Sequence, residues 1–162
     1  MSFRILDHCD GCMACLHQCP ERAIRGGRDL RHEVDPRRCV DCGVCGQICP
    51  IEAVLDDHGK LASRVPRPLR ARPVFDDGLC NGCAMCVDVC PFRCIALVGR
   101  RYDGAAFLAR VEACVGCGEC ERTCIKGALQ LGPFDLARYD PRAEFERLTL
   151  AVIGDEPPTS RR

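Results

Sequence analysis

Four copies of one cysteine pattern, C-x2-C-x2-C-x3-C, constrain this chain more than any other feature of its sequence. Three cysteines within seven residues can enclose a metal centre only if the backbone curls tightly, and glycine adopts such turns at little cost. Glycine precedes the second cysteine in three sets, and Asp41 takes that place in the second set. The repeat therefore predicts four metal-binding loops. The sets are Cys9, Cys12, Cys15 and Cys19; Cys39, Cys42, Cys45 and Cys49; Cys80, Cys83, Cys86 and Cys90; and Cys114, Cys117, Cys120 and Cys124.

Metal ligands explain these cysteines better than disulfides do. The chain has 17 cysteines in 162 residues and only 5% aromatic residues, so a small apolar core needs reinforcement by disulfides or metal. The N-terminal residues lack the apolar run of a signal peptide, and no stretch is long and apolar enough for a membrane span, so we expect a cytoplasmic protein. In that reducing compartment dense cysteines are typical of metal sites, and an odd number suits disulfides poorly.

The spacing also indicates which metal centre is bound. Pro20, Pro50 and Pro91 directly follow the fourth cysteine of their sets, and Ile125 replaces the proline in the last set. This run resembles that of bacterial ferredoxins, which bind 4Fe-4S clusters, whereas structural zinc sites use separated pairs of ligands. We therefore expect four 4Fe-4S clusters. Because clusters bound entirely by cysteine leave no iron open to substrate, and no flavin or nucleotide motif is present, the chain alone is not expected to be an enzyme.

The sets are expected to work in pairs, because the fourth cysteine of a two-cluster ferredoxin ligates the neighbouring cluster. The first cysteines of successive sets are separated by 30, 41 and 34 residues, which favours pairing of the first set with the second and of the third with the fourth. A nested pairing, first with fourth and second with third, is also compatible with the spacing. The tandem ligand groups are Cys9, Cys12, Cys15 and Cys49 (cluster 1); Cys39, Cys42, Cys45 and Cys19 (cluster 2); Cys80, Cys83, Cys86 and Cys124 (cluster 3); and Cys114, Cys117, Cys120 and Cys90 (cluster 4).

The four sets remain similar beyond the fourth cysteine, where a small residue and then an aliphatic residue recur. The pairs are Ala23 and Ile24, Ala53 and Val54, Cys94 and Ile95, and Ala128 and Leu129. We expect the aliphatic residues to pack beside the clusters. Cys94 stands in an alanine position, which favours a buried thiol that is not a ligand over a ligand or reactive role. The histidines at positions 8, 17, 32 and 58 show no metal-binding spacing, and we expect them to be exposed or to form hydrogen bonds.

The predicted fold is α+β, with two tandem bacterial ferredoxin-like domains of little regular secondary structure and a C-terminal extension. The expected domains are residues 1–63 and 74–132, joined by a basic Pro/Arg linker at 64–73 and followed by the extension at 133–162. Short strands are expected at residues 3–6, 33–35, 54–55, 74–75, 97–98, 107–111 and 128–131.

Two segments outside the repeats allow more than one interpretation. The linker is either a solvated connector or a basic strip that docks on an acidic partner. Residues 142–153 can form a short helix and strand that pack either on a partner subunit or on their own domain, and residues 155–162 are expected to be disordered. Nucleic acid is not an expected partner, because aromatic residues do not alternate with the arginines.

Over residues 3–131 the sixteen repeated cysteines and three prolines resemble polyferredoxins and the four-cluster electron-transfer subunits of anaerobic oxidoreductases. The chain is most similar to the small iron-sulfur subunit of tungsten-dependent aldehyde oxidoreductases, and hydrogenase, formate dehydrogenase and oxoacid oxidoreductase subunits are nearly as similar. This resemblance implies a hetero-oligomer in which the chain carries electrons between a metal-pterin subunit and a flavin or ferredoxin partner. The alternatives are a freely diffusing polyferredoxin carrier and an iron-sulfur redox or oxygen sensor.

Overall fold

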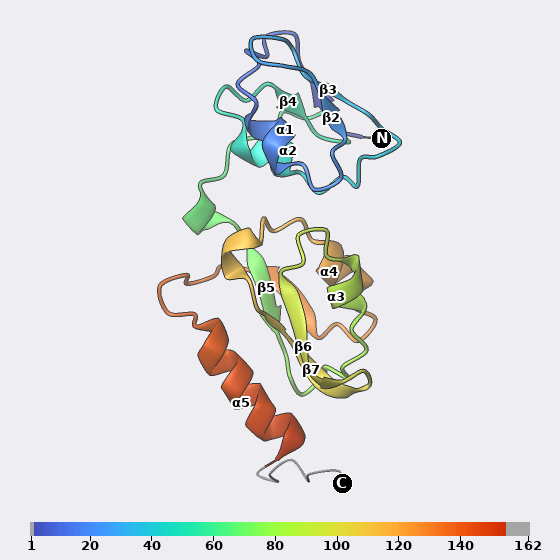
Figure 1. Cartoon of the computed structure of the whole chain (residues 1–162), viewed down its shortest axis with the longest axis vertical. Coiled ribbons are helices and arrows are strands. Elements are labelled where there is room, and N and C mark those ends of the chain that lie inside the picture. Colours follow the sequence, from blue (N-terminus) through green and yellow to red (C-terminus); the bar gives the residue numbers. More distant parts are fainter. Residues whose placement is uncertain (1, 155–162) are drawn as a thin grey trace, which may run out of the picture. The chain divides into compact units, whose positions relative to one another are not determined.

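The computed structural model describes residues 2–154 and divides the chain into two compact units, the first ending at Arg70 and the second beginning at Ala71. Each unit contains two cysteine sets and repeats one plan, in which the first strand pairs with the last and the two middle strands pair with each other (Figure 1). The two short helices of each unit lie against one another. This arrangement brings the two cysteine sets of a unit together.

The first unit contains four strands of two residues each. Strand β1 (Arg4–Ile5) pairs antiparallel with β4 (Val54–Leu55), and β2 (Ile24–Arg25) pairs with β3 (Glu33–Val34). Helices α1 (Ala14–Gln18) and α2 (Val44–Ile48) each carry the third cysteine of a set and end immediately before the fourth. A 3-10 turn, η1 (Arg67–Leu69), precedes the end of the unit.

The second unit has longer strands and a C-terminal helix. Its elements are β5 (Arg72–Phe75), α3 (Met85–Val89), β6 (Ile95–Arg100), β7 (Asp103–Leu108), the 3-10 turn η2 (Val111–Ala113), α4 (Glu119–Thr123), β8 (Leu129–Gly132) and α5 (Pro141–Ile153). Strand β5 pairs antiparallel with β8, and β6 pairs with β7. The strand predicted at residues 107–111 instead runs from 103 to 108, because it pairs along the whole of β6 and the chain then enters η2.

The core of each unit is small and includes the cysteines themselves. In the first unit Phe3, Ile5 and Val54 are buried together with Cys15, Cys45 and Cys49. All eight small and aliphatic residues of the repeat are buried. Because so few apolar side chains fill these cores, a bound metal centre would supply part of the packing that a larger domain obtains from side chains.

The end of the predicted linker belongs to the second unit. Arg72 is fully buried in β5, where its Nε donates a hydrogen bond of 3.3 Å to the carbonyl oxygen of Val111. Its guanidinium carbon lies 5.8 Å from the ring centroid of Phe134. Residues 72 and 73 are therefore not part of a solvated connector, because the pairing of β5 with β8 includes them.

Helix α5 begins at a proline and packs on its own unit. The Asp140 side chain accepts a 2.8 Å hydrogen bond from the backbone amide of Arg142, which caps the helix. Leu148 is buried with Val98, Ala105 and Phe107 of the β6–β7 hairpin. The extension thus forms a single helix rather than the expected helix and strand, and residues 155–162 lie outside the described part of the chain.

Replacing Leu148 by alanine should destabilise the second unit by about 2–5 kcal/mol, because it empties a buried site between α5 and the hairpin. Leu150, on the same helix, is 63% exposed, so Leu150→Ala should change stability by about 0.5 kcal/mol or less. Urea unfolding of both variants, followed by circular dichroism, would measure the difference. Equal midpoints would contradict the packing of α5 on the hairpin.

Candidate metal centres

The backbone of all four cysteine sets adopts left-handed conformations at the same three positions. At these positions φ lies between +50° and +84°. Such residues beside right-handed or turn residues direct successive N–H groups into a concavity, a geometry that binds anions and is common at iron-sulfur sites. Each loop is therefore shaped to surround a negatively charged group. The residues are Gly11, Asp41, Gly82 and Gly116 before the second cysteine, Met13, Gly43, Ala84 and Gly118 after it, and Arg22, Glu52, Arg93 and Gly127 three residues after the fourth.

Met13 and Ala84 directly follow the second cysteine of their sets, and the sequence alone does not mark either as a turn residue. Both take positive φ, 68° and 60°, although neither is glycine, and a side chain there costs about 1–2 kcal/mol. Nothing in their residue type signals this conformation. It becomes visible only when their positions are aligned with Gly43 and Gly118 in the other sets.

The fourth cysteine of each set stands at the C-terminal end of a short helix and receives a backbone hydrogen bond in three of the sets. The amides of Ala23, Ala53 and Cys94 donate to the Sγ atoms of Cys19, Cys49 and Cys90 at 3.2, 3.2 and 3.3 Å. An amide donor favours the thiolate form of a cysteine. The helix therefore separates the third and fourth cysteines, and the following turn provides a donor for the fourth.

The structure brings the cysteines together in groups of three from one set and one from the neighbouring set of the same unit. Three such groups line cavities, the first with about 390 Å³ of empty space and the other two with about 330 Å³ each, partly open to solvent. At the remaining group the charges of Cys9, Cys12 and Cys49 act on Cys15. The cavity groups are Cys80, Cys83, Cys86 and Cys124; Cys90, Cys114, Cys117 and Cys120; and Cys19, Cys39, Cys42 and Cys45.

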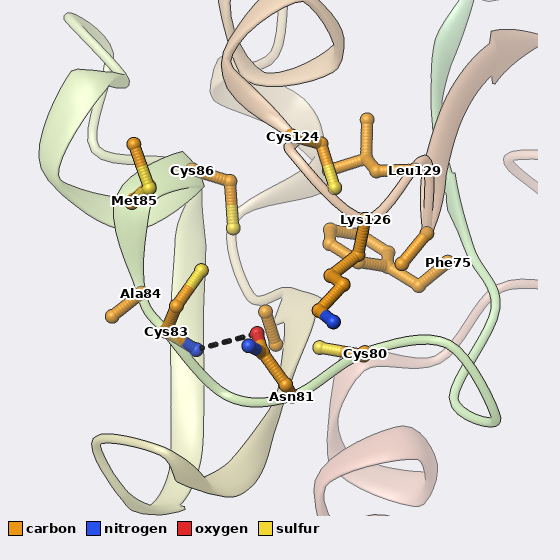
Figure 2. Close-up of a pocket in the computed structure, with 12 residues that line it drawn as sticks. Phe75, Cys80, Asn81, Cys83, Ala84, Met85, Cys86, Cys124, Lys126 and Leu129 are labelled. Carbon is orange, nitrogen blue, oxygen red and sulfur yellow. Dashed lines mark hydrogen bonds between the residues drawn. The ribbon is translucent and has the colours of Figure 1, made fainter.

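Figure 2 shows the first of these cavities, where the four sulfur atoms face a common space. Phe75 and Leu129 form an apolar wall. Asn81 shapes the loop by accepting a 3.3 Å hydrogen bond from the amide of Cys83. The ammonium group of Lys126 extends into the region beside Cys80 (Figure 2). The cavity thus joins four sulfur donors, apolar walls and one positive charge.

Burial raises the pKa of the third cysteine in every set. Desolvation and then neighbouring cysteines raise the pKa of Cys15 and Cys86 to about 11, and those of Cys45 and Cys120 rise to about 12 with desolvation as the largest cause. Thiolates crowded into an apolar site are stable only beside positive charge, which a metal centre supplies. The chemistry of these donor groups therefore fits a metal-sulfur core that is cationic by itself and becomes anionic with its four thiolate ligands, as the loop geometry requires.

The geometry differs from that of a site for one metal ion. Within residues 2–154, no three His, Cys, Asp or Glu side chains are placed to hold a single metal ion. A 4Fe-4S cluster is larger, because each of its thiolates binds a different iron. Such a cluster requires four cysteines placed around a cavity, farther apart than the ligands of a single metal ion.

Cys94 lies beside the cysteines of the fourth candidate centre. It is 1% exposed, which confirms its predicted burial, and it forms hydrogen bonds with Cys114 and Cys90. Hydrogen bonding with these two residues raises the pKa of Cys94. The same interaction is the largest cause that lowers the pKa of Cys90 to about 5 and the pKa of Cys114 to about 7. Cys94 therefore keeps its proton, and its single S–H group can donate to only one of the two neighbouring thiolates at a time.

Replacing Cys94 by alanine should leave the full metal content in place. Alanine is the natural residue at the three corresponding positions, 23, 53 and 128, so the site should accept it without distortion. Iron analysis of the loaded variant would check this. A loss of about four irons per chain would instead make Cys94 a ligand.

His32 is a site residue whose position the sequence did not reveal. It is fully buried, and its Nδ1 atom lies 3.3 Å from the Sγ atom of Cys15. Its Nε2 atom is also buried and has no hydrogen-bond partner in the described structure. By contrast, His8, His17 and His58 are exposed. His32 lies seventeen residues from Cys15 along the chain, and no local pattern marks their contact.

Two family profiles, both described as "4Fe-4S dicluster domain", match residues 8–53 and 72–125, so each covers two consecutive cysteine sets. The chain is 36% identical over 61 residues to "Ferredoxin-2" of Chlorobaculum tepidum, an alignment that covers 34% of this chain and 97% of that protein. None of the helices described is long and apolar enough to cross a membrane.

Subunits of larger enzymes are also similar. "Pyruvate synthase subunit PorD" of Methanothermobacter marburgensis is 40% identical over 54 residues, 33% of this chain and 62% of that one. A tetrathionate reductase subunit of Salmonella typhimurium is 27% identical over 143 residues, 68% of this chain and 52% of that one. The chain thus spans less than two thirds of either of these relatives.

Proposed function

Since the chain belongs to the 4Fe-4S ferredoxin family and is an iron-sulfur electron-transfer protein, we propose that it holds four 4Fe-4S clusters and serves as the wire subunit of a multi-subunit oxidoreductase. The observation that carries this proposal is the repetition of one loop, with its left-handed residues and cysteine donors, at four places in the chain. A 4Fe-4S cluster bound only by cysteine supplies transfer of single electrons and no open site for substrate. The chain by itself is therefore proposed to be non-catalytic.

The proposed ligands are the sixteen repeated cysteines in their tandem groups. Cys49 completes the group of Cys9, Cys12 and Cys15, and Cys19 completes that of the second set. Cys124 and Cys90 complete the groups of the third and fourth sets in the same way. Three cavities lined by these groups, and the effect of Cys49 on Cys15, support the assignment. Backbone amides at the fourth cysteines would help to hold the thiolates.

Similarity to subunits of a pyruvate synthase and a tetrathionate reductase supports a hetero-oligomer. Among such complexes we favour the tungsten-dependent aldehyde oxidoreductase type, with a metal-pterin subunit and a flavin or ferredoxin partner. This choice rests on the resemblance of the cysteine pattern and size. We place the complex in the cytoplasm, because a reducing compartment protects so many thiolates.

Anaerobic purification of the untagged protein from its own organism would test the proposal. We expect about sixteen irons per chain, a capacity of about four electrons in a reductive titration, and copurifying catalytic subunits. Mostly zinc, or far fewer irons, would contradict cluster binding. A loaded monomer that exchanges electrons with many partners would instead indicate a diffusing carrier, and cluster loss that switches a regulatory output would indicate a sensor.

A further inference from the structure

The ring of His32 is tightly packed inside the first unit. Besides its complete burial, the ring is packed against Gly26, where an added Cβ would stand 2.3 Å from the ring's Cδ2 atom. Gly26 also has φ +141°, a conformation that side chains rarely adopt. Glycine at position 26 therefore leaves the space that the imidazole occupies.

The contact between His32 and Cys15 has one chemically favourable direction. A thiolate ligand can only accept a hydrogen bond, so Nδ1 must carry the proton and donate it across the 3.3 Å separation. The neutral ring then leaves Nε2 as an unpaired acceptor, which agrees with its lack of a partner within residues 2–154. Burying such a nitrogen destabilises the fold. An apolar residue would fill the same space without that loss, so packing alone does not explain the histidine.

A hydrogen bond to a ligand sulfur has a defined electronic consequence. Reduction adds negative charge to the cluster and its thiolates, so a donor stabilises the reduced state more than the oxidised state and raises the reduction potential. Both residues of this contact are shielded from water, since Cys15 is 7% exposed and His32 is 0% exposed. Low local polarity strengthens the interaction.

We propose that His32 donates its Nδ1 hydrogen to the Cys15 thiolate and thereby sets the reduction potential of the cluster held by Cys9, Cys12, Cys15 and Cys49 above the value its thiolates and backbone donors would give it. This inference rests on the proposed function, because it needs the first cluster in place. His32 acts as a positioning and tuning residue rather than a ligand. The reducing electron comes from the protein's redox partner, and no bond forms or breaks.

A matched pair of substitutions separates the hydrogen bond from the packing. Asparagine can place an amide N–H near the position of Nδ1–H, whereas leucine has a similar size and no donor. In a reductive titration of the full loaded chain followed by EPR, H32L should lower one of the four midpoints, decreasing the reduced-to-oxidised ratio of that cluster about tenfold, or about 59 mV. H32N should stay within about threefold of wild type. The exposed neighbour His17 provides the control, and H17L should leave all four midpoints unchanged.

A measurement on the unsubstituted protein keeps the proposal testable even if H32L loads poorly. With ¹⁵N-labelled histidine, pulsed EPR of the reduced protein should detect one nitrogen coupled to a cluster, and H32N should lack that coupling while H17N retains it. Absence of the coupling in wild type, or equal shifts in H32L and H32N, would overturn the proposal. Iron analysis distinguishes failure of this inference from failure of the proposed function. A chain with about sixteen irons in which His32 substitutions have no effect would refute only this inference, whereas missing iron would refute the proposed function.

Discussion

Cutting the loaded protein between its two units is expected to yield two fragments that each retain about eight irons and accept about two electrons. Every cysteine group in the structure draws its four members from one unit, so no proposed cluster should depend on both fragments. Leu69 is 75% exposed in η1, and a specific protease sequence inserted after it would allow the cut. Iron analysis after separation of the fragments gives the result.

The same experiment decides between the two pairings that the cysteine spacing allows. In a nested arrangement, first set with fourth and second with third, every cluster would take its fourth ligand from the other fragment. Separation would then release much of the iron, or the fragments would stay joined through their clusters. The uncut protein with the inserted sequence is the control, and it should contain about sixteen irons.

Gly82→Ala is expected to remove the third cluster, or about four of sixteen irons. Gly82 has φ +65°, and a Cβ there would stand 2.5 Å from the carbonyl oxygen and 2.7 Å from the nitrogen of Gly104. Both atoms belong to the backbone of β7, so the clash cannot be relieved by rotating a side chain. The loop carrying Cys80 and Cys83 must shift, and its inward amides and thiolates shift with it.

Gly127 supplies the matched control for this substitution. Its φ of +62° is nearly the same, but no atom of the described residues lies within 4 Å of an added Cβ. Gly127→Ala should therefore carry only the left-handed backbone penalty, about 1–2 kcal/mol, and keep all of its iron. If the two variants lose equal amounts of iron, backbone conformation rather than the contact with β7 controls the loop.

The second cysteine set shows that the loop itself tolerates a side chain. Asp41 occupies the position of Gly82 and adopts φ +50° despite its Cβ. The requirement for glycine at position 82 therefore comes from the strand that crosses close to it and not from the cysteine spacing. This difference could not be read from the sequence, where both positions belong to the same motif.

The local chemistry of this protein was predictable from its residues alone. Each cysteine set, its turn residues and the small and aliphatic pair that follows it lie within about fifteen residues of the sequence. Local backbone geometry is therefore enough to predict how these residues are arranged. For the same reason the expected strands at residues 54–55 and 74–75 lie within observed strands. These features were enough to identify the 4Fe-4S ferredoxin family.

Contacts between segments that are distant in the sequence were not predictable from it and were revealed only by the tertiary structure. The fold placed Arg72 against Val111, 39 residues away, packed α5 on the β6–β7 hairpin and brought His32 to Cys15. It also gathered the fourth cysteine of each set with the neighbouring set of its own unit, whereas the spacing left two pairings open. These contacts arise from burial and shape across the whole unit, and short-range patterns do not encode them.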